Sequence, residues 1–508
     1  MERYDTPPMP DPFAPSTNFY DALVAELHSP ATGRLSHHEL KELLDSQGRL
    51  LLRQLLQDHL DLRALREEQA ARTQRPLVVG PDRLARTRLE MGHQRQLATL
   101  FGTVTVRRCA WRRPATANVY PADATLSLPR RRHSYTLARL AVLESVRASF
   151  DAATEAVCRR CGPVIGKRQV EDLVVDAAAD IDTFYQARIP TPCTADTLLV
   201  LSVDGKGVVM RPDALRPATA KAAARPGLFR TRLASGEKPA RKRMATLAAV
   251  YDAEPAPTRP HDVIAPPGGR HGRRRLRPGP HATAKWLYGS VIDDAATVIK
   301  TAFDQAEARD PGHRRRWVVL VDGARHQLDL IQTEAAVRRV TIHIVIDFVH
   351  VLEYLWGAAW SFHKSGDPAA EDWVAVHALR ILSGGARHTA EAIDTQARSS
   401  NLTGLQRQGA NACIRYLTSK EPFLCYEHAL TAGWPIATGV IEGACRHLIA
   451  DRLDITGARW GLAGAEAILK LRALISNGDL EAYWRFRLAH EHHRLHQGPD
   501  RGGYSLAA

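Results

Sequence analysis

The chain has 508 residues, 44% of them hydrophobic, and a formal net charge of +14. The apolar fraction suits globular packing and excludes wholesale disorder, while the length exceeds what one hydrophobic core usually supports, so several domains are expected. The positive charge favours a polyanionic partner, because each phosphate bound by Lys or Arg releases counterions, although a ribosomal factor or a membrane-surface protein would fit the charge equally well.

Residues 1–130 predict an N-terminal helix followed by a β-rich region. Ser36 and Glu39 are spaced as a capping box, and the leucines that follow recur at the spacing of an amphipathic helix. The alternating segment QLATLFGTVTVRRCAWRR (96–113), with a glycine at its turn, predicts strands.

Residues 131–195 predict a helical domain. Its central part is a helix, a break at Gly162 and Pro163, and a second helix that begins with Lys167 and Arg168. This arrangement resembles a helix-turn-helix, in which the N-terminal residues of the second helix enter the major groove of DNA. A plain helical hairpin in a small bundle is the alternative.

Residues 196–350 predict the first part of an α+β core. The segment TLLVLSVDGKGVVM predicts two strands joined by a turn at Asp204 and Gly205. A third strand, MATLAAVYDAEP, is followed by an Arg-dense loop that we expect to contact phosphate through Arg273, Arg274 and Arg275. Next come a helix, the strand RRWVVLVDG, another helix and the strand IHIVIDF.

Residues 351–434 predict helices only, and residues 435–508 predict a helix carrying Glu442 and C-terminal helices that complete the core. The chain thus predicts the succession of a ribonuclease H-like core, which is three strands, a helix, a strand, a helix, a strand and a final helix. An all-α insertion interrupts this core before the final helix. In that topology the first strand is central, the fourth lies parallel beside it and the fifth lies one further out.

This strand order would bring four carboxylates together. Asp204 and Asp322 would lie side by side at strand ends, with Asp347 at the matching place on the next strand and Glu442 added by the later helix. Carboxylates so arranged can hold two Mg²⁺ (or Mn²⁺) ions beside a phosphodiester, with Asp204 bridging both and Asp322 and Glu442 each binding one. One Asp-Gly after a strand is usually only a turn, but two on neighbouring parallel strands of a basic chain favour a site.

The third carboxylate has alternatives. Glu353 and Glu466 are also on predicted helices, and Glu442 is preferred to them mainly because of a family resemblance. His350, three residues after Asp347, is an accessory candidate that would position the nucleophile or contact the scissile phosphate. A structural role for this histidine is equally compatible with the sequence.

Arginines after Glu442 are further candidates. Arg446 follows one helical turn later, where it can pair with the Glu442 carboxylate or reach a phosphate. Arg452 and Arg459 are weaker candidates for phosphate contact.

Several segments together resemble one protein family. SVDGKG, WVVLVDG, DFVHVLEYLW, GWPIATGVIEGACRHLIADRLDITGARWGL and GAEAILKLRAL are similar to the ISKra-type family of bacterial insertion-sequence transposases, over about residues 95–495. The resemblance implies a DDE transposase with a ribonuclease H-like core, an α-helical insertion before the last Glu, and metal-dependent DNA strand cleavage and transfer at element ends. Asp204, Asp322 and Glu442 match the presumed catalytic carboxylates, and the DxxH from Asp347 to His350 resembles a motif of Mutator-like transposases.

The expected partner is double-stranded DNA, namely the terminal inverted repeats of the element and its target. The resemblance also implies a homo-oligomer in the synaptic complex. Seven scattered cysteines argue for a reducing compartment, and neither a signal peptide nor an apolar run of bilayer length is visible. We therefore expect a cytoplasmic, nucleoid-associated protein with no membrane contact.

The alternative function is that of a catalytically silent DNA-binding protein, a repressor or domesticated factor, on a transposase scaffold. An RNA-cutting nuclease on the same fold is a third option.

Overall fold

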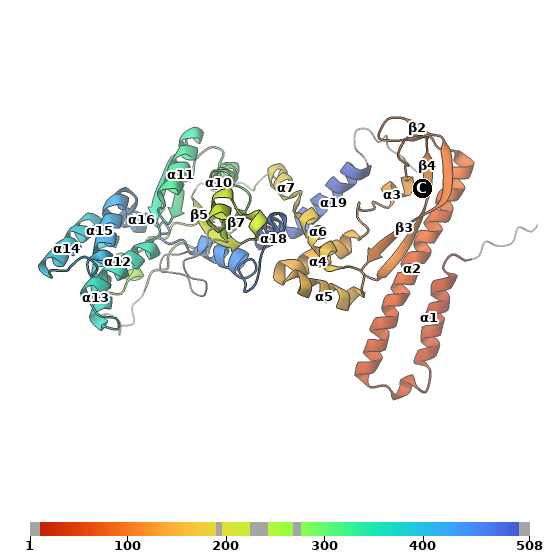
Figure 1. The fold of residues 1–508 in the computed structure, drawn as a ribbon, viewed down its shortest axis with the longest axis horizontal. Helices are drawn as coiled ribbons and strands as arrows, with labels where there is room; N and C mark the ends of the chain where they lie inside the picture. The colour runs from red at the N-terminus through yellow and green to blue at the C-terminus, as the bar shows by residue number, and fades with distance from the viewer. Residues whose placement is uncertain (1–10, 189–195, 224–241, 268–275, 497–508) are drawn as a thin grey trace, which may run out of the picture. The chain divides into compact units, whose positions relative to one another are not determined.

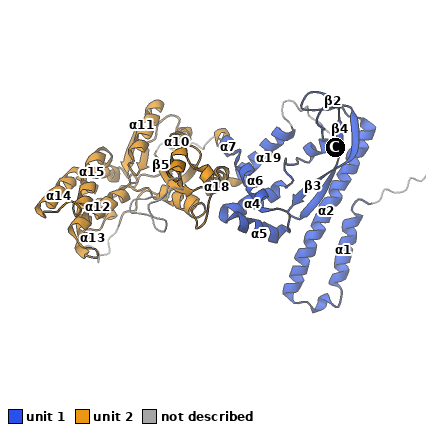
Figure 2. Ribbon diagram, in the orientation of Figure 1, with its two compact units in different colours: residues 1–184, 481–508 blue, residues 185–480 orange. Residues whose placement is uncertain are grey.

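The computed structural model describes residues 11–188, 196–223, 242–267 and 276–496. These residues form two compact units (Figure 2). Unit 1 comprises residues 1–184 and 481–508, and unit 2 comprises residues 185–480. The last predicted domain, 435–508, is therefore divided, because its final helix belongs with the N-terminal region.

Unit 1 begins with helix α1 (Ala14–Leu27) and the long helix α2 (His37–Gln74). The predicted capping box is confirmed: Ser36 Oγ accepts a hydrogen bond from Glu39 N at 3.3 Å, and Glu39 Oε2 accepts one from Ser36 N at 2.7 Å. This reciprocal pair satisfies two N–H groups that the first helical turn leaves without a partner.

A β-hairpin of β3 (Arg88–Thr99) and β4 (Gly102–Arg112) confirms the predicted strands. Helix α2 protects the free edge of β4 with side chains. Gln57 donates to the Thr105 carbonyl at 3.0 Å and accepts from Thr105 N at 2.8 Å, while Glu67 accepts from Cys109 N at 2.9 Å. Edge groups that would otherwise attract another strand are thus paired.

The rest of unit 1 is mainly helical. Its elements are β1 (Val78–Val79), β2 (Ala85–Arg86), α3 (Pro121–Thr125), α4 (Tyr135–Arg147), α5 (Phe150–Cys161), α6 (Lys167–Ala178), most of α7 (Ile181–Ala187), and α19 (Leu480–His496). Helix α19 is held here by Tyr483, whose hydroxyl donates to the Ala177 carbonyl, and by Arg487, which pairs with the buried Asp180 at 3.2 Å.

Unit 2, in which Figure 1 labels β5 and β7, is built on a mixed five-stranded sheet. The strand order is β7-β6-β5-β8-β9. The strands are β5 (Leu198–Val209), β6 (Lys242–Ala253), β7 (Ala282–Ser290), β8 (Trp317–Val321) and β9 (Ile342–Ile346). β5, β6 and β7 pair antiparallel, whereas β5, β8 and β9 pair parallel. As the succession predicts, the first strand is central, with the fourth parallel beside it and the fifth beyond.

The predicted turn at Asp204 and Gly205 is wrong. β5 is one continuous strand that pairs with β6 along its whole length, from Leu198 opposite Ala253 to Val209 opposite Lys242. A two-residue hairpin turn requires positive φ angles, and Gly205 is not among the residues with positive φ. The third antiparallel strand is instead β7, which the sequence pattern did not reveal.

Helices α10 (Ala295–Arg309) and α11 (Arg325–Arg338) cover one face of the sheet. Leu199, Leu201 and Val203 of β5 point into this core, together with the fully buried Trp317 of β8. Because side chains alternate along a strand, Asp204 points to the opposite face.

Helices follow β9 throughout the segment that was predicted to be helical. They are α12 (Phe348–Phe362), α13 (Pro368–Leu382), α14 (Ala386–Ser399), α15 (Gln408–Lys420) and α16 (Tyr426–Thr431). The chain then returns to the sheet with α17 (Gly439–Ala444), the π-helix η5 (Cys445–Ala450) and α18 (Leu462–Ser476). Short helices complete the described chain: η1 (Thr32–Arg34), η2 (Pro212–Ala214), α8 (Pro217–Ala223), α9 (Pro260–Val263) and η4 (Glu421–Phe423). None of the described helices has both the length and the apolar character needed to cross a membrane.

The close approach of α12 and α15 generates a stability prediction. A Cβ atom at Gly409 would lie 2.0 Å from the Gly357 carbonyl oxygen, so we expect Gly409→Ala to destabilise unit 2 by about 1–3 kcal/mol. The control is Gly464→Ala in α18, where the nearest atom to the new Cβ is Cε3 of Trp460 at 3.9 Å; it should be neutral or stabilising by up to about 1 kcal/mol. Urea unfolding measures both, and equal midpoints for the two variants would contradict the predicted clash.

Candidate active site

Asp204 lies in β5 just beyond the part of the strand that pairs with β8. The parallel ladder ends with Ser202 opposite Leu320, so Asp204 has no β8 neighbour although it remains paired with Leu247 of β6. Its side chain is half-buried, and Oδ2 accepts a hydrogen bond from the Cys445 thiol at 3.2 Å. Burial, and after it the Asp204 carboxylate, raise the pKa of Cys445, which keeps the thiol protonated as a donor.

Asp322 directly follows β8 and is half-buried. Its Oδ1 accepts a hydrogen bond from Ala324 N at 2.9 Å, and its backbone carbonyl accepts one from the Tyr416 hydroxyl at 3.2 Å. The next residue, Gly323, has φ +88°, and a Cβ there would lie 2.8 Å from Cδ1 of Ile346. Glycine is therefore required for the chain to turn sharply from the strand into α11.

Asp347 occupies the matching place after β9, as predicted, but its carboxylate is fully buried. Its own backbone N–H donates to the Val321 carbonyl at 2.8 Å, immediately before Asp322. The carboxylate accepts hydrogen bonds from Val349 N at 3.1 Å and from Thr438, both from its N–H at 3.3 Å and from its hydroxyl at 2.7 Å. Asp347 thus caps α12 and ties it to the segment before α17.

Glu442 is exposed on α17, and its Oε1 lies 3.0 Å from the Thr438 hydroxyl. Thr438 therefore contacts both Asp347 and Glu442. Three residues after Glu442, Cys445 contacts Asp204. The α17–η5 segment consequently links the ends of β5 and β9 and brings Glu442 to the carboxylates.

The two alternative glutamates have other roles. Glu466 is buried and accepts hydrogen bonds from the Ser290 hydroxyl at 2.8 Å and from the N–H groups of Val291 and Ile292 at 2.7 and 3.1 Å. It therefore anchors the end of β7. Glu353 is exposed on α12 and pairs with His350 at 3.0 Å.

The aromatic pair Tyr416 and Tyr354 borders the same carboxylates. The two rings stack with centroids 3.9 Å apart. Burial is the main cause that raises the pKa of Tyr416, and the neighbouring Tyr354, Asp322 and Asp347 add to it. The phenol therefore stays protonated and donates to the Asp322 carbonyl.

The donor set suits Mg²⁺ or Mn²⁺ in its chemistry, because its ligands would be carboxylate oxygens. In the part of the chain that the structure describes, however, no three His, Cys, Asp or Glu side chains are already arranged to hold a metal ion. Asp204, Asp322 and Glu442 are thus neighbours along a connected set of contacts, but they are not preassembled as ligands.

Three residues at this site went unnoticed in the sequence: Thr438, Cys445 and Lys206. Lys206 follows Asp204 by two positions in β5, so it shares the same face of the sheet. Its charge acts on Cys445, where it lowers the pKa against the larger effect of burial. The turn expected at Asp204 would have ended the strand before Lys206. The sequence pattern therefore did not place this lysine beside Asp204.

The candidate phosphate-binding arginines differ in accessibility. Arg446 and Arg459 are exposed. The expectation that Arg452 contacts phosphate requires a correction. Arg452 is buried, with its guanidinium 4.7 Å from the Trp460 ring centroid, and burial lowers its pKa to about 10, with a smaller contribution from Arg472. This side chain packs in the interior of unit 2, so the expected contact with phosphate is not supported. Arg273, Arg274 and Arg275 lie outside the described residues.

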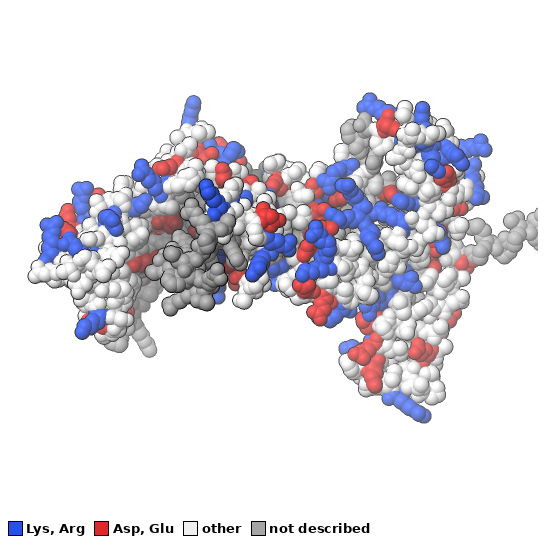
Figure 3. Space-filling model, viewed as in Figure 1, with Lys and Arg blue, Asp and Glu red and all other residues white. Residues whose placement is uncertain are grey.

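In unit 1, the predicted helix, break and helix are present as α5 and α6, and α4 packs against both. Lys167 pairs with Asp151 at 2.7 Å, and Arg168 lies 3.7 Å from Glu171 and from Asp172. The start of α6 thus mixes basic and acidic groups. On the visible face of unit 1, Lys and Arg side chains gather around the β3–β4 hairpin (Figure 3).

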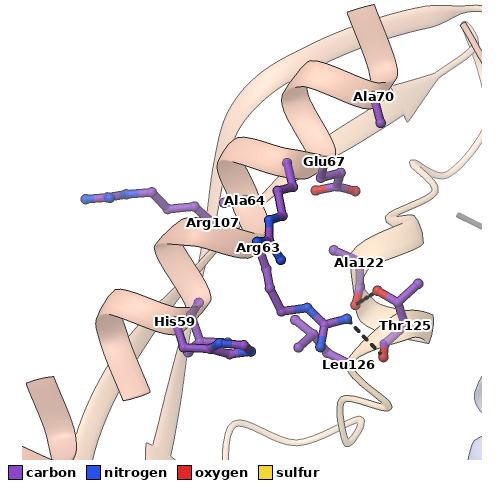
Figure 4. Close-up of a pocket in the computed structure, with 11 residues that line it drawn as sticks. His59, Arg63, Ala64, Glu67, Ala70, Arg107, Ala122, Thr125 and Leu126 are labelled. Carbon is purple, nitrogen blue, oxygen red and sulfur yellow. Dashed lines mark hydrogen bonds between the residues drawn. The ribbon is translucent and has the colours of Figure 1, made fainter. Parts of the chain in front are cut away.

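Unit 1 also has a hollow of about 390 Å³ lined by α2, α3 and β4 (Figure 4). Arg63 reaches across it to donate to the Thr125 carbonyl at 3.4 Å, and the buried Glu67 lies beside it. None of the predicted site residues lines this hollow.

Compared with models of protein families and with curated proteins, the chain matches none. The function therefore has to be inferred from the chemistry of the site and from the resemblance of its motifs.

The different surroundings of the two glutamates generate a prediction. Glu466→Gln should destabilise the protein by about 1–3 kcal/mol, because the buried carboxylate loses charge-assisted hydrogen bonds and its pairing with Lys470 at 3.3 Å. Glu442→Gln serves as the comparison and should change stability by less than about 0.5 kcal/mol, because Glu442 is exposed. Thermal unfolding measures the stability of both variants. A larger loss of stability for Glu442→Gln than for Glu466→Gln would contradict the structural role assigned to Glu466.

Proposed function

We propose that this protein is a DNA transposase of a bacterial insertion sequence, which cleaves and transfers DNA strands at element ends with a metal-dependent DDE site. The observation that carries the proposal is the position of the carboxylates. Asp204 and Asp322 lie just beyond the pairing of two neighbouring parallel strands. The segment that carries Glu442 reaches this end of the sheet through Thr438, which contacts Asp347, and through Cys445, which contacts Asp204. The resemblance of these motifs to ISKra-type transposases points the same way.

In this proposal, the sheet of unit 2 and its helices α10, α11, α17 and α18 form a ribonuclease H-like core. The strand order and directions support it. Helices α12 to α16 would then be the all-α insertion, which separates β9 from the helix that carries Glu442.

Asp204, Asp322 and Glu442 would hold Mg²⁺ or Mn²⁺ in the working complex. When bound, the metal supplies a lowered pKa for the attacking water or 3′-hydroxyl and stabilises the leaving oxygen. The residues of the chain do the rest. Cys445 donates to Oδ2 of Asp204 and Gly205 N donates to its Oδ1, while Ala324 N donates to Oδ1 of Asp322, so that these contacts orient both carboxylates.

Cations near the carboxylates would receive the DNA backbone. Lys206 lies on the Asp204 face of β5, and Arg446 and Arg459 are exposed on the segment that follows Glu442. The net charge of +14 supports a polyanionic partner. We further propose double-stranded DNA as that partner, contacts from Lys167 and Arg168 of α6, a homo-oligomeric synaptic complex, and a cytoplasmic, nucleoid-associated location.

A catalytically silent DNA-binding protein is the second candidate. It is favoured by unit 1, which forms a compact body with its own helix, break and helix and contains none of the proposed catalytic carboxylates. Binding by such a unit would not need metal chemistry elsewhere in the chain.

Cleavage of labelled DNA distinguishes the two functions. We expect the protein to cut fragments that carry the inverted repeats flanking its gene, with Mg²⁺ or Mn²⁺ and not with EDTA. Asp204→Asn, Asp322→Asn and Glu442→Gln should each lower the rate by more than about a hundredfold, since even the loss of a group that supports a metal ligand typically costs ten- to a hundredfold.

Asp329→Asn is the matched control, because Asp329 is an exposed carboxylate on α11 that follows Asp322 in the sequence. It should cleave at the wild-type rate. Wild-type cleavage by Asp204→Asn would overturn the assignment of the site, and a wild-type protein that binds the ends without cutting them under either metal would favour the silent DNA-binding protein.

A further inference from the structure

Thr438 occupies an unusual place between two carboxylates. Its side chain is 5% exposed, and its hydroxyl lies 2.7 Å from Oδ2 of Asp347 and 3.0 Å from Oε1 of Glu442. A threonine at the start of a helix normally uses its hydroxyl to cap that helix. Thr438 precedes α17 but makes no such side-chain cap, so its hydroxyl is committed to the two carboxylates.

Asp347 is the fixed member of this group. It is fully buried, and backbone N–H groups from two elements, those of Val349 and Thr438, donate to its carboxylate. The adjacent Phe348 N donates to the Ile436 carbonyl at 2.9 Å, which attaches the chain before α17 to the end of β9 a second time. Asp347 therefore has little freedom to move toward a ligand.

The hydroxyl of Thr438 has one proton and can donate it to only one carboxylate at a time. When the proton is given to Glu442, Oδ1 of Asp347 keeps its two backbone donors and Oδ2 gives up the hydroxyl donor. When the proton is given to Asp347, Glu442 is released. The contact can consequently hold Glu442 in place or free it, and Asp347 keeps its two backbone hydrogen bonds in both cases.

We propose that Thr438 is a positioning residue, which fixes the Glu442 carboxylate against the buried Asp347 and thereby places it for strand cleavage. Asp347 is then an anchor, and it acts through Thr438 without binding metal or DNA itself. The proposal rests on the proposed transposase function, because it assigns a role in that reaction. It requires the hydroxyl of Thr438 and not its methyl group.

Three variants test this requirement. Thr438→Val keeps the shape and removes the hydroxyl, and Thr438→Ser keeps the hydroxyl. Thr389→Val is the control for losing a buried threonine hydroxyl elsewhere in unit 2; Thr389 is fully buried on α14 and donates to the Gly385 carbonyl at 2.8 Å.

We expect single-turnover cleavage at saturating DNA to be slower by about ten- to a hundredfold in Thr438→Val, with unchanged DNA affinity and a higher Mg²⁺ concentration at half-maximal rate. Thr438→Ser should restore the rate to within about threefold of the wild type, and Thr389→Val should leave it unchanged. If Thr438→Val cleaves like the wild type, or if Thr438→Ser is as slow as Thr438→Val, the positioning role is overturned while the transposase assignment stands.

A crystal structure of Thr438→Val separates the two hypotheses if the wild type does not cleave at all. An inactive wild type would contradict the proposed function. The positioning role of Thr438 would then be tested by the position of the Glu442 carboxylate in the crystal structure of the variant. A Glu442 carboxylate that has left its place beside residue 438, with the Val349 bond to Asp347 retained, supports the claim, and an unmoved Glu442 overturns it.

Discussion

The candidate site depends on the hydrogen bonds that Asp347 accepts at the end of β9. Glu442 and the two candidate aspartates, Asp204 and Asp322, are far apart in the sequence, and a long series of helices lies between β9 and α17. Only a specific attachment at the end of that series can give Glu442 a defined place near β5 and β8. Asp347 provides this attachment through Thr438, and the hydrogen bond from Phe348 to Ile436 reinforces it.

The carboxylates of unit 2 fall into two groups by their surroundings. Asp347, Glu466 and Asp252 are buried, and each is held by several donors or by a buried cation, as Asp252 is by Arg315 at 2.7 Å. An unpaired buried charge would cost several kcal/mol, so these groups have structural positions. Asp204, Asp322 and Glu442, in contrast, retain access to solvent. They are able to exchange water for a new ligand.

The sequence predicted the strands that carry the aspartates because buried parallel strands are short apolar runs, and the run before Asp322 is unmistakable. It predicted the course of β5 wrongly, since Asp-Gly is a local turn signal, whereas the pairing with β6 that overrides it is a long-range contact. The choice among Glu442, Glu353 and Glu466 was likewise undetermined. Glu466 is buried against Ser290, whereas Glu442 contacts Thr438. Neither contact can be recognised from the residues next to these glutamates in the sequence. Arg452 was misjudged for the same reason, because nothing near it in sequence indicates its contact with Trp460.

The π-helix η5 has a consequence for how this part of the chain can vary. A π-helical turn contains an extra residue compared with an α-helical one, and each residue rotates a helix by about 100°. The extra residue of η5 therefore sets the phase of the buried Leu448 and Ile449 relative to Cys445, which meets Asp204 at the start of this turn. Substitutions on the exposed side of the segment leave this phase unchanged, but losing or gaining a single residue within η5 would turn Leu448 and Ile449 out of their buried positions. The segment after Glu442 is thus constrained in its length more strictly than in its composition.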